Sequence, residues 1–93
     1  MASDQGRYVN ITTNTTTVLN SYPGGGVLKR IIVNSIGTTS TASIFDNTAG
    51  SGASIGVLQT TLIGSVEYNC SYGSGLTIVT AGGAAANITV VFS

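Results

Sequence analysis

The chain has 93 residues and a formal net charge of zero, and charged residues make up only 6% of it, against roughly 25% in a typical soluble domain. This length suits one domain and leaves no room for two. Lys29-Arg30 is the only basic pair, which argues against nucleic acid or an anionic membrane as a partner, because phosphate binding needs clustered basic residues. Gly, Ser and Thr take the place of the missing charges, which favours strands joined by tight turns.

Residues 1–6 are expected to form a flexible N-terminal arm, and residues 7–93 a single domain. The first residues lack an apolar stretch, so we expect no signal peptide and synthesis in a cytoplasm. No apolar run approaches about 20 residues, so no transmembrane segment is expected. Cys70 is the only cysteine, which excludes an internal disulfide. Because so small a core usually needs a further stabilising device, we expect a homo-oligomer.

Eight short segments are predicted as strands, because each is rich in β-branched or alternating apolar residues and is bounded by turn-forming residues. In chain order they are Arg7–Ile11, Thr15–Leu19, Val27–Asn34, Thr41–Asp46, Ser54–Gln59, Ser65–Ser71, Leu76–Thr80 and Asn87–Phe92.

Alternation along Val27–Asn34, the most clearly predicted of these strands, predicts which of its side chains face the core. Val27, Ile31 and Val33 are expected on one face of the strand, with Leu28 and Ile32 on the other.

Three further side chains are expected in the core or on its apolar face. Phe45 and Phe92 are predicted core aromatics. Cys70 shares the phase of Val66 and Tyr68, so it is interpreted as a small buried apolar residue rather than a reactive thiol.

About eight strands with turn signals at roughly 8–12-residue intervals predict an all-β protein with antiparallel strands in a single compact β-sandwich. No useful helix fits between any two strands, which argues against parallel βαβ units. A jelly-roll-like arrangement is the expected eight-strand sandwich, although the strand order cannot be read from the sequence.

Catalytic chemistry has few candidates in this sequence. There is no histidine, so the commonest general base and metal ligand is missing, and the only carboxylates are Asp4, Asp46 and Glu67. A glycosidase needs two carboxylates across a cleft, and nothing in the sequence brings Asp46 and Glu67 together. We therefore predict that the chain is not an enzyme and expect no metal or cofactor.

Five residues are candidate partner contacts: Arg7, Tyr8, Tyr22, Pro23 and Tyr72. The tyrosines lie next to the N-terminal arm, beside the proline and in a predicted turn, and tyrosine is enriched at protein interfaces. Local packing of these tyrosines over loops remains an equal alternative.

A family resemblance begins at Gly26. The segments that carry it are Gly26–Leu28, Ile31–Asn34, Ser40-Thr41, Ile44–Gly52, Gly75–Thr80 and Ala85–Val90. This pattern resembles small β-sandwich proteins encoded among the structural genes of tailed bacteriophages and prophages. The Asp-Asn-Thr-Ala loop and the Gly-Leu-Thr-Ile-Val run are its more specific parts. The family usually carries Tyr where this chain has Phe45, and residues 1–25 look individual.

The resemblance implies a virion structural protein, and within that class a capsid decoration (cement) protein. Such a protein is made in the bacterial host cytoplasm, is often a homotrimer, and binds the major capsid protein of the same phage on the capsid exterior. One alternative is a phage tail, fibre or baseplate module. Another is a carbohydrate-binding module, although the chain lacks tryptophan and its tyrosines are scattered.

Overall fold

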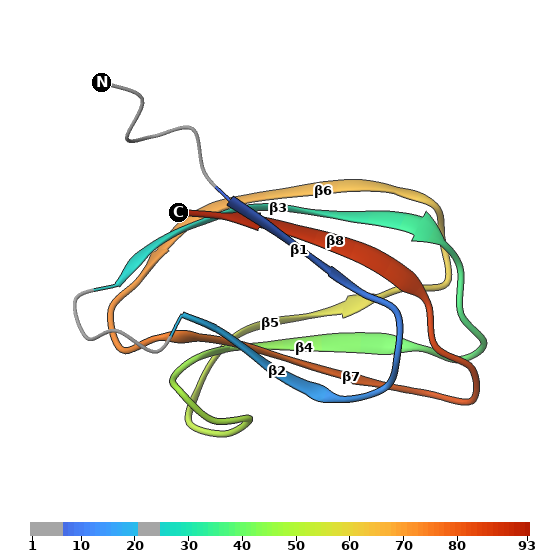
Figure 1. The fold of residues 1–93 in the computed structure, drawn as a ribbon, viewed down its shortest axis with the longest axis horizontal. Helices are drawn as coiled ribbons and strands as arrows, with labels where there is room; N and C mark the ends of the chain where they lie inside the picture. The colour runs from blue at the N-terminus through green and yellow to red at the C-terminus, as the bar shows by residue number, and fades with distance from the viewer. Residues whose placement is uncertain (1–6, 21–24) are drawn as a thin grey trace.

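The computed structural model describes residues 7–20 and 25–93, and in them the chain forms two facing four-stranded antiparallel sheets (Figure 1). No helix occurs in this described part of the chain, so the predicted all-β sandwich is confirmed. The strands are β1 (Arg7–Ile11), β2 (Thr16–Asn20), β3 (Gly26–Ser35), β4 (Thr41–Asp46), β5 (Ala53–Gln59), β6 (Gly64–Tyr72), β7 (Leu76–Ala81) and β8 (Asn87–Phe92).

The two sheets have the strand orders β1-β8-β3-β6 (sheet A) and β2-β7-β4-β5 (sheet B). Strands pair about the middle of the chain: β1 with β8, β2 with β7, β3 with β6, and β4 with β5. The chain is therefore one long hairpin whose successive strand pairs fall alternately in sheet A and sheet B. Eight strands wrapped in this way form a jelly roll, as the sequence predicted.

The core lies between the sheets and is built from side chains that face inward from the strands of both sheets. Its buried members are Ile11, Leu28, Ile31, Val33, Ala42, Ile44, Tyr72, Leu76, Ile78, Ile88, Val90 and Phe92. These residues come from both sheets, so burial of their apolar surface is what holds sheet A against sheet B.

A β-bulge in β3 changes which side chains of this strand face the core, so part of the prediction for this strand is wrong. Leu28 is fully buried with Ile31, although the sequence analysis placed the two on opposite faces. Leu28 pairs with Phe92 and Arg30 pairs with Val91, so two steps along β3 match one step along β8. The extra residue reverses the phase of the strand and brings Leu28 into the core.

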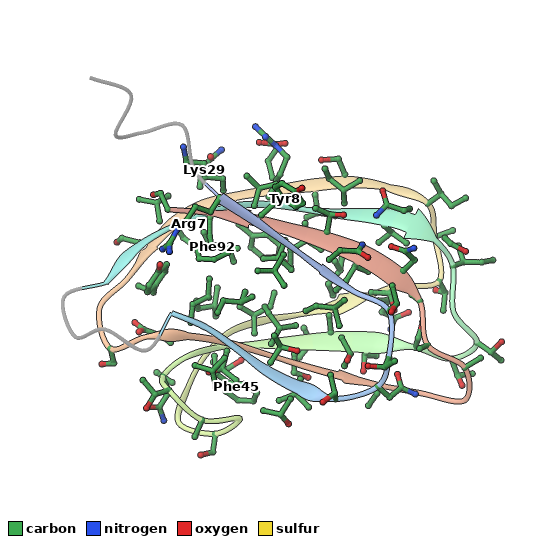
Figure 2. All side chains as sticks on the ribbon, in the orientation of Figure 1. Arg7, Tyr8, Lys29, Phe45 and Phe92 are labelled. Carbon is green, nitrogen blue, oxygen red and sulfur yellow. The ribbon has the colours of Figure 1, made fainter. Side chains whose placement is uncertain are left out.

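Phe45 was predicted in the core with Phe92, and this second prediction is also wrong. Its neighbour Ile44 points inward and is fully buried, so strand alternation turns Phe45 to the outer face of sheet B, where it is half-buried. Figure 2 shows Phe45 on the side of sheet B that faces away from Phe92.

Candidate functional site

Arg7 and Tyr8, two of the predicted contact residues, lie on β1 at one edge of sheet A. The Arg7 guanidinium carbon lies 4.8 Å from the centroid of the Phe92 ring, a cation–π contact (Figure 2). Tyr8 is 73% exposed, so its side chain is available to a partner. Tyr22 and Pro23 lie outside the described residues.

Tyr72 is the predicted contact residue that the structure places differently. It belongs to the buried core at the end of β6, and its hydroxyl donates a hydrogen bond to the carbonyl oxygen of Ser93 at 2.7 Å. β6 lies at the opposite edge of sheet A from β1. The structure therefore does not bring Tyr72 together with Tyr8, and Tyr72 offers no surface contact in this conformation.

The charged side chains of the described residues are concentrated on sheet A. Arg7 is on β1, Lys29 and Arg30 are on β3, and Glu67 is on β6. The Arg30 Nε atom lies 2.8 Å from Glu67 Oε2, and both side chains are partly exposed. An exposed pair of this kind contributes at most about 1 kcal/mol to stability. The remaining described charge, Asp46, lies at the end of β4.

Asp46 stabilises the turn between β6 and β7. Its carboxylate accepts hydrogen bonds from the backbone N–H of Ser74 at 2.7 Å and of Gly73 at 3.0 Å. The bond from Ser74, and then the one from Gly73, lowers the pKa of Asp46 below its usual value, because both favour the charged carboxylate. We interpret Asp46 as a structural residue that ties two loops together at this end of the sandwich.

Asp46 and Glu67 are too far apart to act as a glycosidase pair. Asp46 contacts Gly73, and Glu67 lies six residues earlier along β6, which corresponds to roughly 20 Å at the rise of a strand. A glycosidase pair needs a separation of about 5–9.5 Å.

Cys70 is a free, partly buried cysteine that packs against the core beside Tyr68. Burial, and secondly the neighbouring Cys70, raises the pKa of the Tyr68 hydroxyl. In residues 7–20 and 25–93, no three His, Cys, Asp or Glu side chains are grouped so that they could hold a metal ion. The same part of the chain contains no helix that could cross a membrane.

The outer face of sheet B carries no charged side chain in its two central rows. One row crosses all four strands as Thr16, Val79, Ser43 and Val57, and the next as Val18, Thr77, Phe45 and Ser54. The turn between β4 and β5, which is also uncharged, covers one corner, where Thr77 Oγ1 donates a hydrogen bond to the carbonyl oxygen of Asn47 at 2.8 Å. We call these eight residues the sheet B face; Thr77 among them is fully buried, so the other seven are the ones a partner can reach. It offers methyl and hydroxyl groups to a partner, and no charges.

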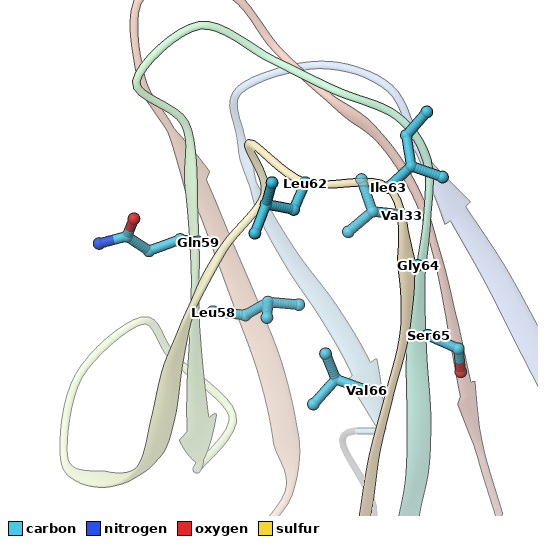
Figure 3. Close-up of a pocket in the computed structure, with 8 residues that line it drawn as sticks. All are labelled: Val33, Leu58, Gln59, Leu62, Ile63, Gly64, Ser65 and Val66. Carbon is cyan, nitrogen blue, oxygen red and sulfur yellow. The ribbon is translucent and has the colours of Figure 1, made fainter.

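An apolar pocket of about 260 Å³ opens between the edge strands β5 and β6 (Figure 3). Val33, Leu58, Leu62 and Val66 point toward the pocket, while Ile63 points away from it. Leu62 is 78% exposed and Ile63 is 71% exposed. Leu58, Leu62, Ile63 and Val66 are called the β5–β6 patch below.

Sequence reasoning missed the β5–β6 patch because it treated residues 60–64 only as a connection between strands. The available signal was Leu62-Ile63, two consecutive large apolar residues in a turn, where polar residues are usual.

The loop between β3 and β4 holds the turn of the β5–β6 patch in place. Thr60 donates its backbone N–H to the Ser40 carbonyl at 3.0 Å, and its carbonyl accepts from the Gly37 N–H at 3.1 Å. The buried Thr60 hydroxyl also donates to the Ser40 hydroxyl at 2.5 Å. These bonds hold Thr60 in place, and the turn that carries Leu62 and Ile63 begins at this residue.

No protein-family model matches this chain, and no curated protein matches it in sequence.

Proposed function

We propose that this protein decorates the outside of a tailed-phage capsid by binding the major capsid protein through the sheet B face. The observation that carries the proposal is the unequal distribution of charge over the two sheets. Sheet A holds all the described charges except Asp46, whereas the sheet B face holds none. A whole uncharged face on a small jelly roll suits contact by shape, hydrogen bonds and apolar burial.

Capsid geometry would make such contacts effective. A shell repeats the same binding surface many times, so an oligomer of this chain would attach through several equivalent contacts at once. Linked contacts of moderate strength then give tight overall attachment, without strong charges in any single one. A rigid two-layer sandwich that spans a seam between capsid subunits would also resist their separation.

The absence of charge on the sheet B face makes salt dependence informative. Binding that depends on charge weakens as salt screens it, whereas apolar and neutral hydrogen-bonded contacts change little. We therefore expect attachment to expanded capsids to be nearly the same at low and at high salt. Co-sedimentation of the purified protein with expanded capsids, over a series of salt concentrations, measures this directly.

Val18→Lys is the variant that tests the docking surface. Val18 is 45% exposed on the sheet B face, so a lysine there is tolerated by the fold but puts an unpaired charge into the contact. We expect capsid binding to weaken by at least about tenfold, because the contact would bury a charge that has no partner. Tyr8→Lys, an exposed position on sheet A, is the matched control and should bind as the unchanged protein does.

Three results would contradict this proposal in different ways. Loss of binding in Tyr8→Lys but not in Val18→Lys would move the contact to β1, which carries two of the five expected contact residues. Binding to phage tails instead of capsids would favour the tail, fibre or baseplate alternative. Retention on an immobilised polysaccharide, with no binding to either particle, would favour a carbohydrate-binding module.

A further inference from the structure

The β5–β6 patch is an apolar surface that the described part of the chain leaves uncovered. Val33 forms a buried wall of its pocket, and Leu58, Leu62 and Val66 point toward the same space (Figure 3). None of the residues that line the pocket is charged. Gln59 and Ser65 at its rim are exposed and polar. An apolar centre with a polar rim is the usual anatomy of a contact between protein subunits.

Both sheets end beside this patch. β5 is an edge strand of sheet B, and β6 is an edge strand of sheet A that pairs with β3 alone among the described strands. An edge strand presents backbone N–H and C=O groups that can pair with another chain. Exposed apolar side chains next to two such edges form a surface that a stable protein normally covers.

The shape of the patch favours a second copy of the same chain as its cover. Ile63 is largely exposed, and its side chain is directed away from the pocket, which lies directly beside it (Figure 3). Contacts between identical copies need a surface that carries both a projection and its matching hollow. The pocket, at about 260 Å³, is also smaller than the roughly 300–1,000 Å³ typical of small-molecule sites.

The charges near the patch also favour a second copy of the chain as the partner that covers it. Two copies that meet through this patch bring no like charges together, because the pocket lining contains none. The nearest charge along β6 is Glu67, and it is already paired with Arg30. A partner with a charged docking surface would instead lose solvation of its charges, and the charge next to the patch, Glu67, already has Arg30 as its partner.

We propose that a second copy of this chain covers the β5–β6 patch, with Ile63 of one copy seated in the pocket of the next. The contact can be reciprocal across a twofold axis or repeat around a threefold axis, as in the expected trimer. The inference goes beyond the proposed function, since a contact between copies holds or fails in the purified protein with no capsid present.

Sedimentation equilibrium of the purified chain over a wide concentration range tests this inference. One copy is 9.3 kDa, so the expected mass is 2 × 9.3 = 18.6 kDa or 3 × 9.3 = 27.9 kDa. In Leu62→Asp and Ile63→Asp, a charge at the contact should weaken self-association at least about tenfold and shift the mass toward 9.3 kDa. Val18→Lys is the control, exposed but far from the patch, and should keep the mass of the unchanged protein.

Circular dichroism shows whether each variant is folded. If an aspartate variant does not fold, the milder change Ile63→Ser replaces it in the mass measurement. A mass of 9.3 kDa for the unchanged protein at every concentration would overturn the inference. So would full-size assemblies of the folded patch variants. Because Val18→Lys tests capsid binding and the patch variants test mass, failure of this inference is distinguishable from failure of the proposed function.

Discussion

Asp46 shows how one of the few carboxylates in the chain is used. Its two oxygens accept backbone hydrogen bonds from Gly73 and Ser74, which ties the end of β4 to the turn between β6 and β7. These bonds lower the pKa of the carboxyl below 3.8, so they favour the folded state whenever the group is charged. The stabilisation is present above the unfolded-state pKa and is lost as the pH falls through the lower, folded-state pKa.

We therefore expect Asp46→Asn to be less stable than the unchanged protein near neutral pH, and the difference to shrink at acid pH. A protonated carboxyl and an amide offer similar neutral acceptors, which is why the two proteins should converge. Urea unfolding at about pH 7 and about pH 2.5 measures the difference. Asp46→Ala, which removes both oxygens, should remain less stable at both values. An unchanged gap between Asp46→Asn and the original protein would rule out this role of the charge.

The face of the sheet on which a side chain lies could be predicted only where its strand alternates regularly, without a bulge. Phe92 was placed correctly because β8 alternates without a break from Ile88. Leu28 was misplaced because a bulge adds a residue to β3, and sequence alternation contains no sign of it. Phe45 was misplaced because its size suggested the core, whereas the phase set by Ile44 turns it outward. For Tyr72 the phase of Cys70 indicated the core, but it was assigned to a turn.

At the scale of elements, the buried pair Ser40 and Thr60 connects the loop before β4 to the turn after β5. Thr60→Val keeps the shape of the side chain and removes only its hydroxyl, while Ser40 Oγ can still donate to the Thr60 carbonyl oxygen. We expect a loss of about 1 kcal/mol in the free energy of unfolding, the usual net value of one hydrogen bond. Urea denaturation measures this loss.

The neighbouring Thr61→Val provides a control for that change. The Thr61 hydroxyl makes no hydrogen bond within the described part of the chain, so its loss should alter stability by less than about 0.5 kcal/mol. Equal stability of Thr60→Val and the unchanged protein would mean that the hydroxyl pair does not hold the turn. The position of the β5–β6 patch would then rest on the backbone hydrogen bonds alone.

The strands themselves were predictable because glycine, asparagine, serine and proline mark their ends. The first, fourth and eighth predicted strands, Arg7–Ile11, Thr41–Asp46 and Asn87–Phe92, have the bounds found in the structure, and each of the other five differs by one residue at one or both ends. The strand order was not predictable, since the pairs join distant parts of the chain, such as Arg7 with Phe92. Nothing local in either strand specifies which of the other strands it will pair with.

For the whole molecule, the important property is where the few charges lie. Composition gives 6% charged residues but not their distribution, which depends on the strand order. The jelly roll places β1, β3 and β6 in sheet A, and with them four of the five described charges. The result is one charged and one uncharged face, together with an apolar edge between β5 and β6. We propose that the uncharged face meets the capsid and the apolar edge meets another copy.

The number of copies in the virion tests capsid decoration most directly. Under the proposed function a phage encodes this chain, and quantitative mass spectrometry of its purified particles gives the ratio of the chain to the major capsid protein. Capsid decoration predicts a fixed, small whole-number relation between the two, because each binding surface repeats with the shell. Absence from purified virions would contradict this account, and so would the few copies expected of a tail or baseplate part.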